Sequence, residues 1–147
     1  MTRVHVKWIG GRQYLAADEA GHVVVTDDHG QGFKPSNLLL VALATCAGVD
    51  LVGILEKKRQ KFTSIEASVS RQNAPDPPWT IEKIELDWVI RGRDLKEKAV
   101  HDAVHLAEEK YCSVKASLKS EVVTTIHVVN EVEEAGPPAR PKRAKTG

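Results

Sequence analysis

The stretch from Leu38 to Leu55 constrains the fold more than any other feature, because it is almost entirely apolar. Start signals at Pro35 and Ser36 precede it, and the pattern predicts a helix over roughly residues 36 to 60. Residues 38–44 are apolar nearly all round the predicted helix, so most of its sides must be covered. A chain of 147 residues has little material for covering them alone, and we therefore expect a dimer.

The same apolar stretch approaches the length of a membrane-spanning helix. It includes Thr45 and Asp50, however, and the charged residues 56–59 follow it at once, so we interpret it as a buried helix of a soluble protein. The N-terminal residues contain no apolar core of a signal peptide, which makes the cytosol the expected location. The formal net charge is +1 with charges spread along the chain, so we expect neither nucleic acid nor a membrane as a partner.

Alternating apolar and polar residues predict β-strands on both sides of this helix. Before it, Val4–Trp8 and His22–Thr26 are separated by glycine-containing turns and indicate an N-terminal β-meander. After it, Ile65–Val69 and Ile84–Ile90 flank a proline-rich turn and indicate a hairpin.

A second helix and a last strand complete the predicted order. Asp94 and Glu97 resemble a capping box, and apolar residues at helical spacing carry this helix to about residue 111. The alternation in Val122–Val128 then predicts a strand. The expected order is βββ-α-ββ-α-β, which is an α+β fold.

One domain is expected over residues 1–130, since periodicity is lost from Glu131 onward. Residues 131–147 are rich in proline and charge and are predicted to form a flexible, solubilising tail. The alternative for this basic tail is a weak contact with an anion or a nucleic acid.

Only two cysteines occur, Cys46 and Cys112, which excludes a disulfide-rich scaffold and any CxxC motif. Cys46 has small and aliphatic neighbours, and burial in such surroundings usually raises the pKa of a thiol and leaves it inert. A nearby cation would favour the thiolate. Arg12 is the candidate, because the preceding Gly10-Gly11 pair allows close approach and a guanidinium stays protonated. Lowering the thiol pKa from about 8.5 to about 6 would raise the thiolate fraction at pH 7 roughly 30-fold.

Three segments form a pattern that is more specific together than separately. They are Pro35–Cys46, which begins Pro-x-x-Leu-Leu and ends Ala-Thr-Cys, the second cysteine segment Lys110–Val114, and the arginine turn Gly10–Arg12. In this order and spacing they resemble the OsmC/Ohr family, and the likeness spans about residues 3 to 129. The resemblance implies an intertwined homodimer with its active sites at the subunit interface.

Residue by residue, the resemblance implies that Cys46 is the peroxidatic thiolate and Cys112 the resolving thiol. Arg12 would stabilise the thiolate and orient the peroxide. The thiolate attacks the distal peroxide oxygen, an alcohol leaves, and the sulfenic acid condenses with Cys112 to form a disulfide. An external dithiol, of lipoyl or another type, reduces it, and neither cofactor nor metal is expected. The expected substrates are organic or fatty-acyl hydroperoxides, held in a slot lined by the aliphatic residues that flank Cys46.

One residue departs from the family pattern. Ser36 stands where the organic-hydroperoxide branch has a glutamate that holds the arginine in place. Serine cannot supply that charge, so we interpret Ser36 as a helix N-cap and the chain as a divergent branch. Asp50, one turn after Cys46, is interpreted as a structural or solvated carboxylate. Two alternatives to a peroxidase stay open: a small-molecule-binding protein on the same fold, and a redox sensor with little turnover.

Two other signals receive ordinary structural interpretations. His101 and His105 have the i, i+4 spacing that can bind a metal, but they share a polar helix face with Glu108, so a solvated face is expected. The tryptophans are interpreted as core or interface anchors, since no basic cluster accompanies them. They are Trp8, Trp79 and Trp88.

Overall fold

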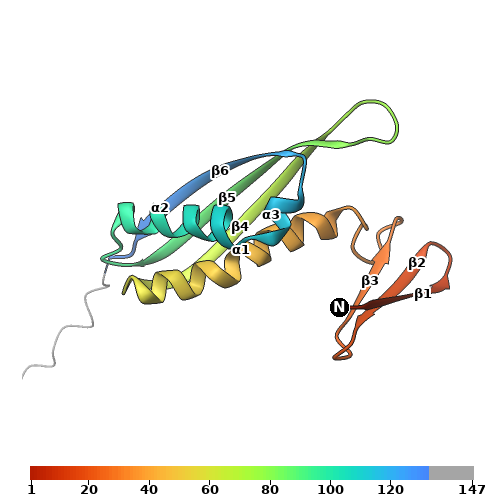
Figure 1. Ribbon diagram of the computed structural model, residues 1–147, viewed down its shortest axis with the longest axis horizontal. Coiled ribbons are helices and arrows are strands. Elements are labelled where there is room, and N and C mark those ends of the chain that lie inside the picture. Colours follow the sequence, from red (N-terminus) through yellow and green to blue (C-terminus); the bar gives the residue numbers. More distant parts are fainter. Residues whose placement is uncertain (133–147) are drawn as a thin grey trace, which may run out of the picture.

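Two three-stranded sheets and a helical layer make up the computed structural model, which describes residues 1–132 (Figure 1). In chain order the elements are β1 Val4–Gly10, β2 Gln13–Asp18, β3 Val23–Asp27, α1 Asn37–Lys57, β4 Lys61–Asn73, β5 Ile81–Arg93, α2 Glu97–Leu106, the π-helical turn η1 Ala107–Tyr111, α3 Ser113–Ser117 and β6 Glu121–Asn130. The predicted α+β class and the predicted order of strands and long helices are confirmed. The short helix α3 was not predicted, and nearly all of the predicted tail lies outside the described residues.

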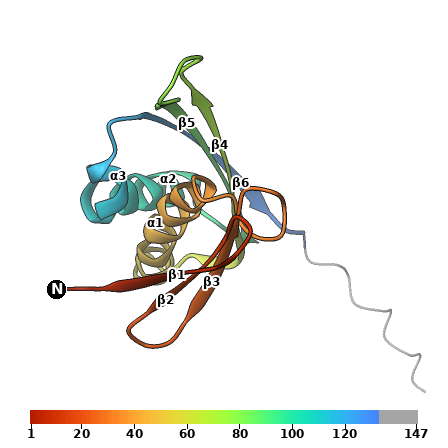
Figure 2. The same ribbon diagram turned by 90° about the vertical axis from the view of Figure 1, so that its right-hand side faces the viewer.

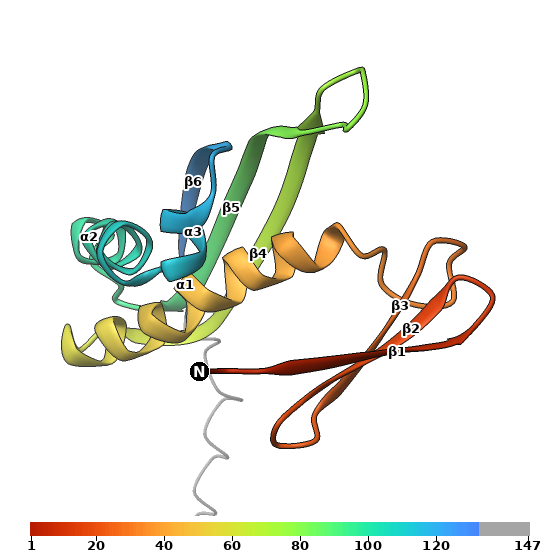
Figure 3. The same ribbon diagram turned by 45° about the vertical axis from the view of Figure 1, so that its right-hand side comes forward.

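The N-terminal sheet is an antiparallel meander in the order β1-β2-β3. Gly10 and Gly11 have φ values of 121° and 53°, which are accessible to glycine and let the chain turn sharply between β1 and β2. The sheet lies beyond the N-terminal end of α1 and makes little contact with the rest of the chain (Figures 1 and 3). Its apolar side chains are therefore open in a single chain, with Val4 63% and Trp8 61% exposed. Apolar patches of this kind mark interaction surfaces.

The second sheet has the order β4-β5-β6, with β5 in the centre. β4 and β5 form a long antiparallel hairpin, whereas β5 and β6 are parallel. A parallel pair requires a crossover connection, and α2, η1 and α3 supply it. All the helices lie on one face of this sheet (Figure 2).

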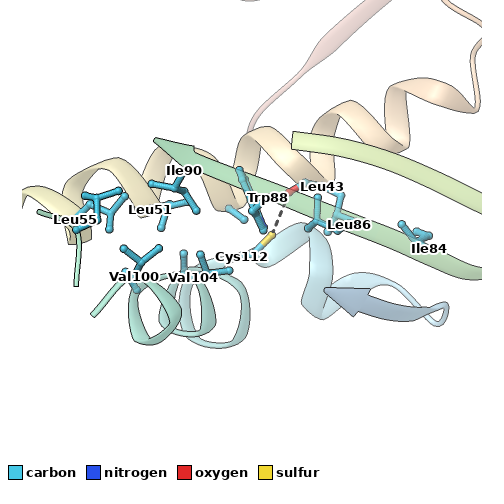
Figure 4. Close-up of a cluster of buried hydrophobic side chains, with 14 residues drawn as sticks. Leu43, Leu51, Leu55, Ile84, Leu86, Trp88, Ile90, Val100, Val104 and Cys112 are labelled. Carbon is cyan, nitrogen blue, oxygen red and sulfur yellow. Dashed lines mark hydrogen bonds between the residues drawn. The ribbon is translucent and has the colours of Figure 1, made fainter. Parts of the chain in front are cut away.

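The hydrophobic core lies between α1, α2 and the inner face of the second sheet (Figure 4). The predicted alternation in β5 is confirmed, because its inward-facing side chains are almost completely buried: Ile84, Leu86, Trp88 and Ile90. α1 buries a single stripe, formed by Leu43, Ala47, Leu51 and Leu55. Among the described helices, α1 alone is long and apolar enough to cross a membrane, and its buried stripe is part of this core.

The predicted N-cap role of Ser36 is wrong. Ser36 occupies the N-cap position of α1, but its φ and ψ are helical at −68° and −20°, and its hydroxyl makes no capping bond. The first amides of the helix donate instead to backbone carbonyls, from Asn37 to Lys34 at 2.8 Å and from Leu38 to Pro35 at 3.2 Å. Because this tight turn satisfies them, the hydroxyl is not needed as an acceptor.

The predicted capping box of α2 is also wrong. Asp94 has a φ of 49°, and the N-cap position belongs to Lys96, whose side chain does not cap. Amide side chains from distant segments accept the free N–H groups at this end: Leu95 N–H donates to Asn130 Oδ1 at 2.7 Å, and Lys96 N–H donates to Gln60 Oε1 at 2.8 Å. These long-range acceptors replace the local one that the sequence indicated.

Candidate active site

The structure places Cys46 and Cys112 side by side, although they are far apart in the sequence. Cys46 lies in the middle of α1 and is half-buried, while Cys112 is 3% exposed and lies between η1 and α3. Both thiols are free. The Cys46 Sγ atom is 3.8 Å from the hydroxyl of Ser113, the residue next to Cys112, and the two thiols are close enough to influence each other's pKa.

Cys112 is held by backbone groups on both sides. Its Sγ–H donates to the carbonyl of Leu43 at 3.8 Å, which ties Cys112 to α1 (Figure 4). The backbone N–H of Lys115 donates to the same sulfur at 3.3 Å and caps α3. Cys112 itself is extended, with φ −77° and ψ 98°, so the chain changes direction here directly after the wide π-helical turn.

Hydrogen bonds lower the pKa of the Cys46 thiol below its ordinary value. The strongest influence is the backbone N–H of Val114, and partial burial acts in the opposite direction. Smaller contributions that also lower the pKa come from the Cys112 side chain and from Ser113. These donors favour the thiolate, which is the nucleophilic form of cysteine.

The pKa of Cys112 is shifted in the opposite direction. Burial raises it most, and the neighbouring Cys46 raises it further, against the hydrogen bond from the Lys115 amide. Because the two thiols influence each other, their proton losses are coupled, and the two pKa shifts favour the thiolate at Cys46 over the thiolate at Cys112. The pair therefore consists of a half-buried thiol that ionises more readily and a buried thiol that ionises less readily.

We expect this difference to appear in the pH dependence of alkylation. Because the pKa of Cys46 is lowered and that of Cys112 is raised, the rate at Cys46 should increase with pH at lower values than the rate at Cys112. Limited iodoacetamide labelling from pH 5 to 9, followed by peptide mass spectrometry, measures both rates. The Cys112→Ser variant isolates Cys46. Equal profiles for the two cysteines would contradict the assignment.

Arg12 is not next to Cys46 within one chain. It lies in the turn between β1 and β2, where its Nη1 forms an ion pair with Asp28 Oδ2 at 2.9 Å and its side chain is 64% exposed. The predicted effect on the thiol, a lowered pKa, is present, but within the chain the backbone N–H of Val114 supplies it in place of a cation. Asp50, the other charged candidate, is half-buried and lines a separate cavity with Lys57 and Tyr111.

An apolar groove of about 690 Å³ runs between α1 and the second sheet. Neighbours of Cys46 in the sequence line it, among them Ala44, Thr45 and Gly48, but Cys46 itself does not. That this groove is the predicted aliphatic slot stays a prediction. The lining of the groove is Asn37, Leu40, Val41, Ala44, Thr45, Gly48, Val49, Val52, Ile65, Ala67, Val69 and Trp88.

The site includes a buried carboxylate, Glu108, for which the prediction from the sequence is wrong. Glu108 was expected on a solvated helix face, but it is 4% exposed. It accepts hydrogen bonds from Trp88 Nε1 at 2.9 Å, from Thr124 Oγ1 at 2.7 Å and from Lys115 Nζ at 2.9 Å. The π-helical turn Ala107–Tyr111 rotates the residues after α2, so that Glu108 faces the core. The sequence contains no local pattern that predicts this turn. The histidines His101 and His105 of the same predicted face are exposed, as expected.

The sequence comparison identifies the family of the chain. The profile of the OsmC-like protein family matches residues 28–127, so the chain belongs to this family. Protein YhfA of Escherichia coli (strain K12) is 34% identical over 125 residues, which cover 84% of this chain and 93% of YhfA. The resemblance found in the sequence is therefore confirmed at the level of the family.

Two crystal structures extend the comparison to the fold. A hypothetical protein from Aquifex aeolicus VF5 superposes with a TM-score of 0.82 at 30% identity, covering 90% of this chain and 98% of that chain. The organic hydroperoxide resistance protein OhrB of Bacillus subtilis superposes with a TM-score of 0.59 at 19% identity, covering 87% of this chain and 97% of that chain. At that identity, the second structure shows a common fold.

Proposed function

We propose that this protein is a thiol-dependent peroxidase that reduces organic or fatty-acyl hydroperoxides. The observation that carries the proposal is the pair of unlike thiols: Cys46, accessible with a lowered pKa, next to Cys112, buried with a raised pKa. Membership of the OsmC-like family supports it, as does the common fold with a protein named for resistance to organic hydroperoxides.

The chemistry divides between the two sulfurs. The Cys46 thiolate attacks the distal oxygen of the hydroperoxide, the O–O bond breaks, and the alkoxide leaves as an alcohol after taking up a proton. The Cys112 sulfur then attacks the sulfenic acid, forming an S–S bond and releasing water. An external dithiol, of lipoyl or another type, donates two electrons and two protons to restore both thiols. We place this cycle in the cytosol, where such reductants keep thiols reduced.

The catalytic unit in this proposal is a homodimer, as the resemblance implies. The open apolar face of the N-terminal sheet and the half-buried α1 supply surface for a second copy. In such a dimer, Arg12 of the partner subunit would approach Cys46 and orient the peroxide. Arg12 lies in the turn between β1 and β2, and this sheet extends away from the helices and the second sheet of its own chain (Figure 3).

The experiment that tests the proposal is oxidation of the reduced protein with one equivalent of cumene hydroperoxide, followed by mass spectrometry. The expected product is lighter by two hydrogens and contains a disulfide that joins the Cys46 and Cys112 peptides. In the matched variant Cys112→Ser, Cys46 should accumulate as a sulfenic acid that dimedone traps. An unmodified Cys46 in both proteins would contradict the proposal.

A small-molecule-binding protein or a redox sensor with little turnover is the second candidate. The observation that favours it is the apolar groove of about 690 Å³, which could hold an aliphatic ligand without contact to Cys46. Negligible peroxide turnover together with a raised Tm in the presence of a fatty acid would select the binding protein. Slow disulfide formation that changes partner binding would select the sensor.

A further inference from the structure

Glu108 is a charged group in the core that the proposed chemistry does not use. Its carboxylate is 4% exposed, and all three of its hydrogen-bond donors belong to different elements: Trp88 on β5, Thr124 on β6 and Lys115 on α3. Lys115 is itself only 16% exposed and also pairs with Glu109. Burying an ion pair costs desolvation energy that the attraction between the charges does not always recover. A pair retained in the core therefore invites an explanation beyond stability.

Lys115 connects this carboxylate to the cysteine pair. Its Nζ donates to Glu108 at 2.9 Å, and its backbone N–H donates to Cys112 Sγ at 3.3 Å. Between Cys112 and Lys115 lie Ser113 and Val114. The hydroxyl of Ser113 is 3.8 Å from the Cys46 sulfur, and the backbone N–H of Val114 is the main group that lowers the pKa of Cys46. The position of those donors thus depends on how the Lys115 end of the segment is held.

Trp88 connects the Glu108 carboxylate to α1, the helix that carries Cys46. Its Nε1 donates to Glu108 at 2.9 Å, and its ring faces Gly48 on α1, where an added Cβ would lie 3.6 Å from the ring. Gly48 is two residues from Cys46 on the same helix. Glu108 is therefore held by a side chain that also packs against the helix of the nucleophile.

We propose that Glu108 and Lys115 are positioning residues, whose buried ion pair holds residues 112–114 against Cys46 and so keeps the Val114 N–H and the Cys112 thiol within reach of the Cys46 sulfur. The catalytic consequence rests on the proposed peroxidase function, whereas the effect on the Cys46 thiol does not. The π-helical turn η1 contributes by directing Glu108 toward the core.

The charges around this pair come from three elements. Lys115 faces Glu108 from α3, Glu109 faces Lys115 from η1, and α2 contributes ionisable side chains to a cavity of about 410 Å³ that reaches the pair. Those α2 side chains are His101, Asp102 and His105. The variants of Glu108 and Lys115 below keep all three of these side chains.

Glu108→Gln tests the inference. Glutamine has the same size and can still bond Trp88 and Thr124, but it cannot pair electrostatically with Lys115. With the segment less firmly held, Cys46 loses hydrogen bonding to its thiolate, and its pKa should rise. The thiolate fraction of Cys46, and with it the alkylation rate, should fall at every pH below the new pKa, approaching about tenfold for each unit of increase at pH values below both pKa values. The pH profile of labelling by iodoacetamide in the Cys112→Ser background measures it.

Two further variants separate positioning from folding. Lys115→Met alone leaves a buried carboxylate without its cation, so it is combined with Glu108→Gln, which removes both charges and should fold. This double variant should show the same raised Cys46 pKa as Glu108→Gln. Lys98→Met is the matched control, because it removes an exposed ion pair with Asp102 on α2 and should leave the profile unchanged.

The outcomes distinguish this inference from the proposed function. If the double variant folds and its Cys46 is alkylated with the wild-type pH profile, the positioning role is wrong, whatever the peroxidase activity. If the profile shifts as expected but the wild-type protein does not consume hydroperoxide, the positioning role stands and the proposed function fails. If both hold, turnover at pH 7 in Glu108→Gln should fall with the thiolate fraction and recover in part at higher pH.

Discussion

Cys46→Ser is expected to lower dithiol-dependent turnover of cumene hydroperoxide by at least about 1000-fold, because it removes the proposed nucleophile. A serine hydroxyl remains protonated at neutral pH, whereas the hydrogen bond from Val114 lowers the pKa of Cys46 and favours its thiolate. Serine is nearly the size of cysteine, so the packing of α1 against α3 should be preserved. Steady-state consumption of the peroxide at a fixed dithiol concentration measures the effect.

Thr45→Ser is the matched control for this variant. Thr45 is the neighbour of Cys46 on α1, and its hydroxyl donates to the carbonyl of Val41 at 2.7 Å, which serine can also do. Turnover in Thr45→Ser should stay within about twofold of the wild type. Cys46→Ser protein that consumed hydroperoxide at the wild-type rate would end the peroxidase proposal and leave the binding or sensing candidates.

Local periodicity predicted the elements of the second sheet and the long helices well, because it reports burial directly. The alternation in Ile84–Ile90 marks the inner face of β5, and the apolar run from Leu38 to Leu55 marks α1. The proximity of Cys46 and Cys112 has no such local signal. It was expected from the family resemblance, and it depends on the crossover that brings α3 against α1.

Features that depend on distant residues could not be predicted from local patterns. Gln60 and Asn130 satisfy the N-terminal end of α2, and they do so across more than 30 positions of sequence in each case. The burial of Glu108 depends on Trp88 and Thr124, which belong to different strands. Helical spacing groups residues by the face of one helix and carries no information about the strands that cover this face. This spacing therefore predicted that Glu108 is solvated.

The role of Arg12 illustrates a different limit. Two positive-φ glycines produce the expected turn, but the direction in which the N-terminal sheet extends is a tertiary property. Within one chain, Arg12 pairs with Asp28 and not with the cysteine site. A prediction made from one sequence cannot distinguish a residue that acts on its own chain from one that acts on a second copy.

Gly92→Ala is expected to destabilise the fold by about 3 kcal/mol or more, because the central strand has no room for a side chain there. Gly92 is paired with Phe62 on β4 and with Asn130 on β6. A Cβ at this position would lie 2.2 Å from the Lys61 carbonyl oxygen and 2.7 Å from the Phe62 Cα. Both are backbone atoms next to the irregularity between Phe62 and Ser64, so neither can move without breaking strand pairing. Thermal unfolding should show a Tm lower by roughly 10 °C.

Gly53→Ala provides the comparison, because it adds the same methyl group where the structure has space for it. Gly53 lies within α1, and nothing stands within 4 Å of an added Cβ. Alanine is the better helix former by about 1 kcal/mol, so this variant should be as stable as the wild type or more stable. The two substitutions have the same chemistry and opposite expected signs. If Gly92→Ala unfolded at the wild-type temperature, the close approach of β4 to β5 at Gly92 would be wrong, and with it the register that positions Trp88 against Gly48 of α1.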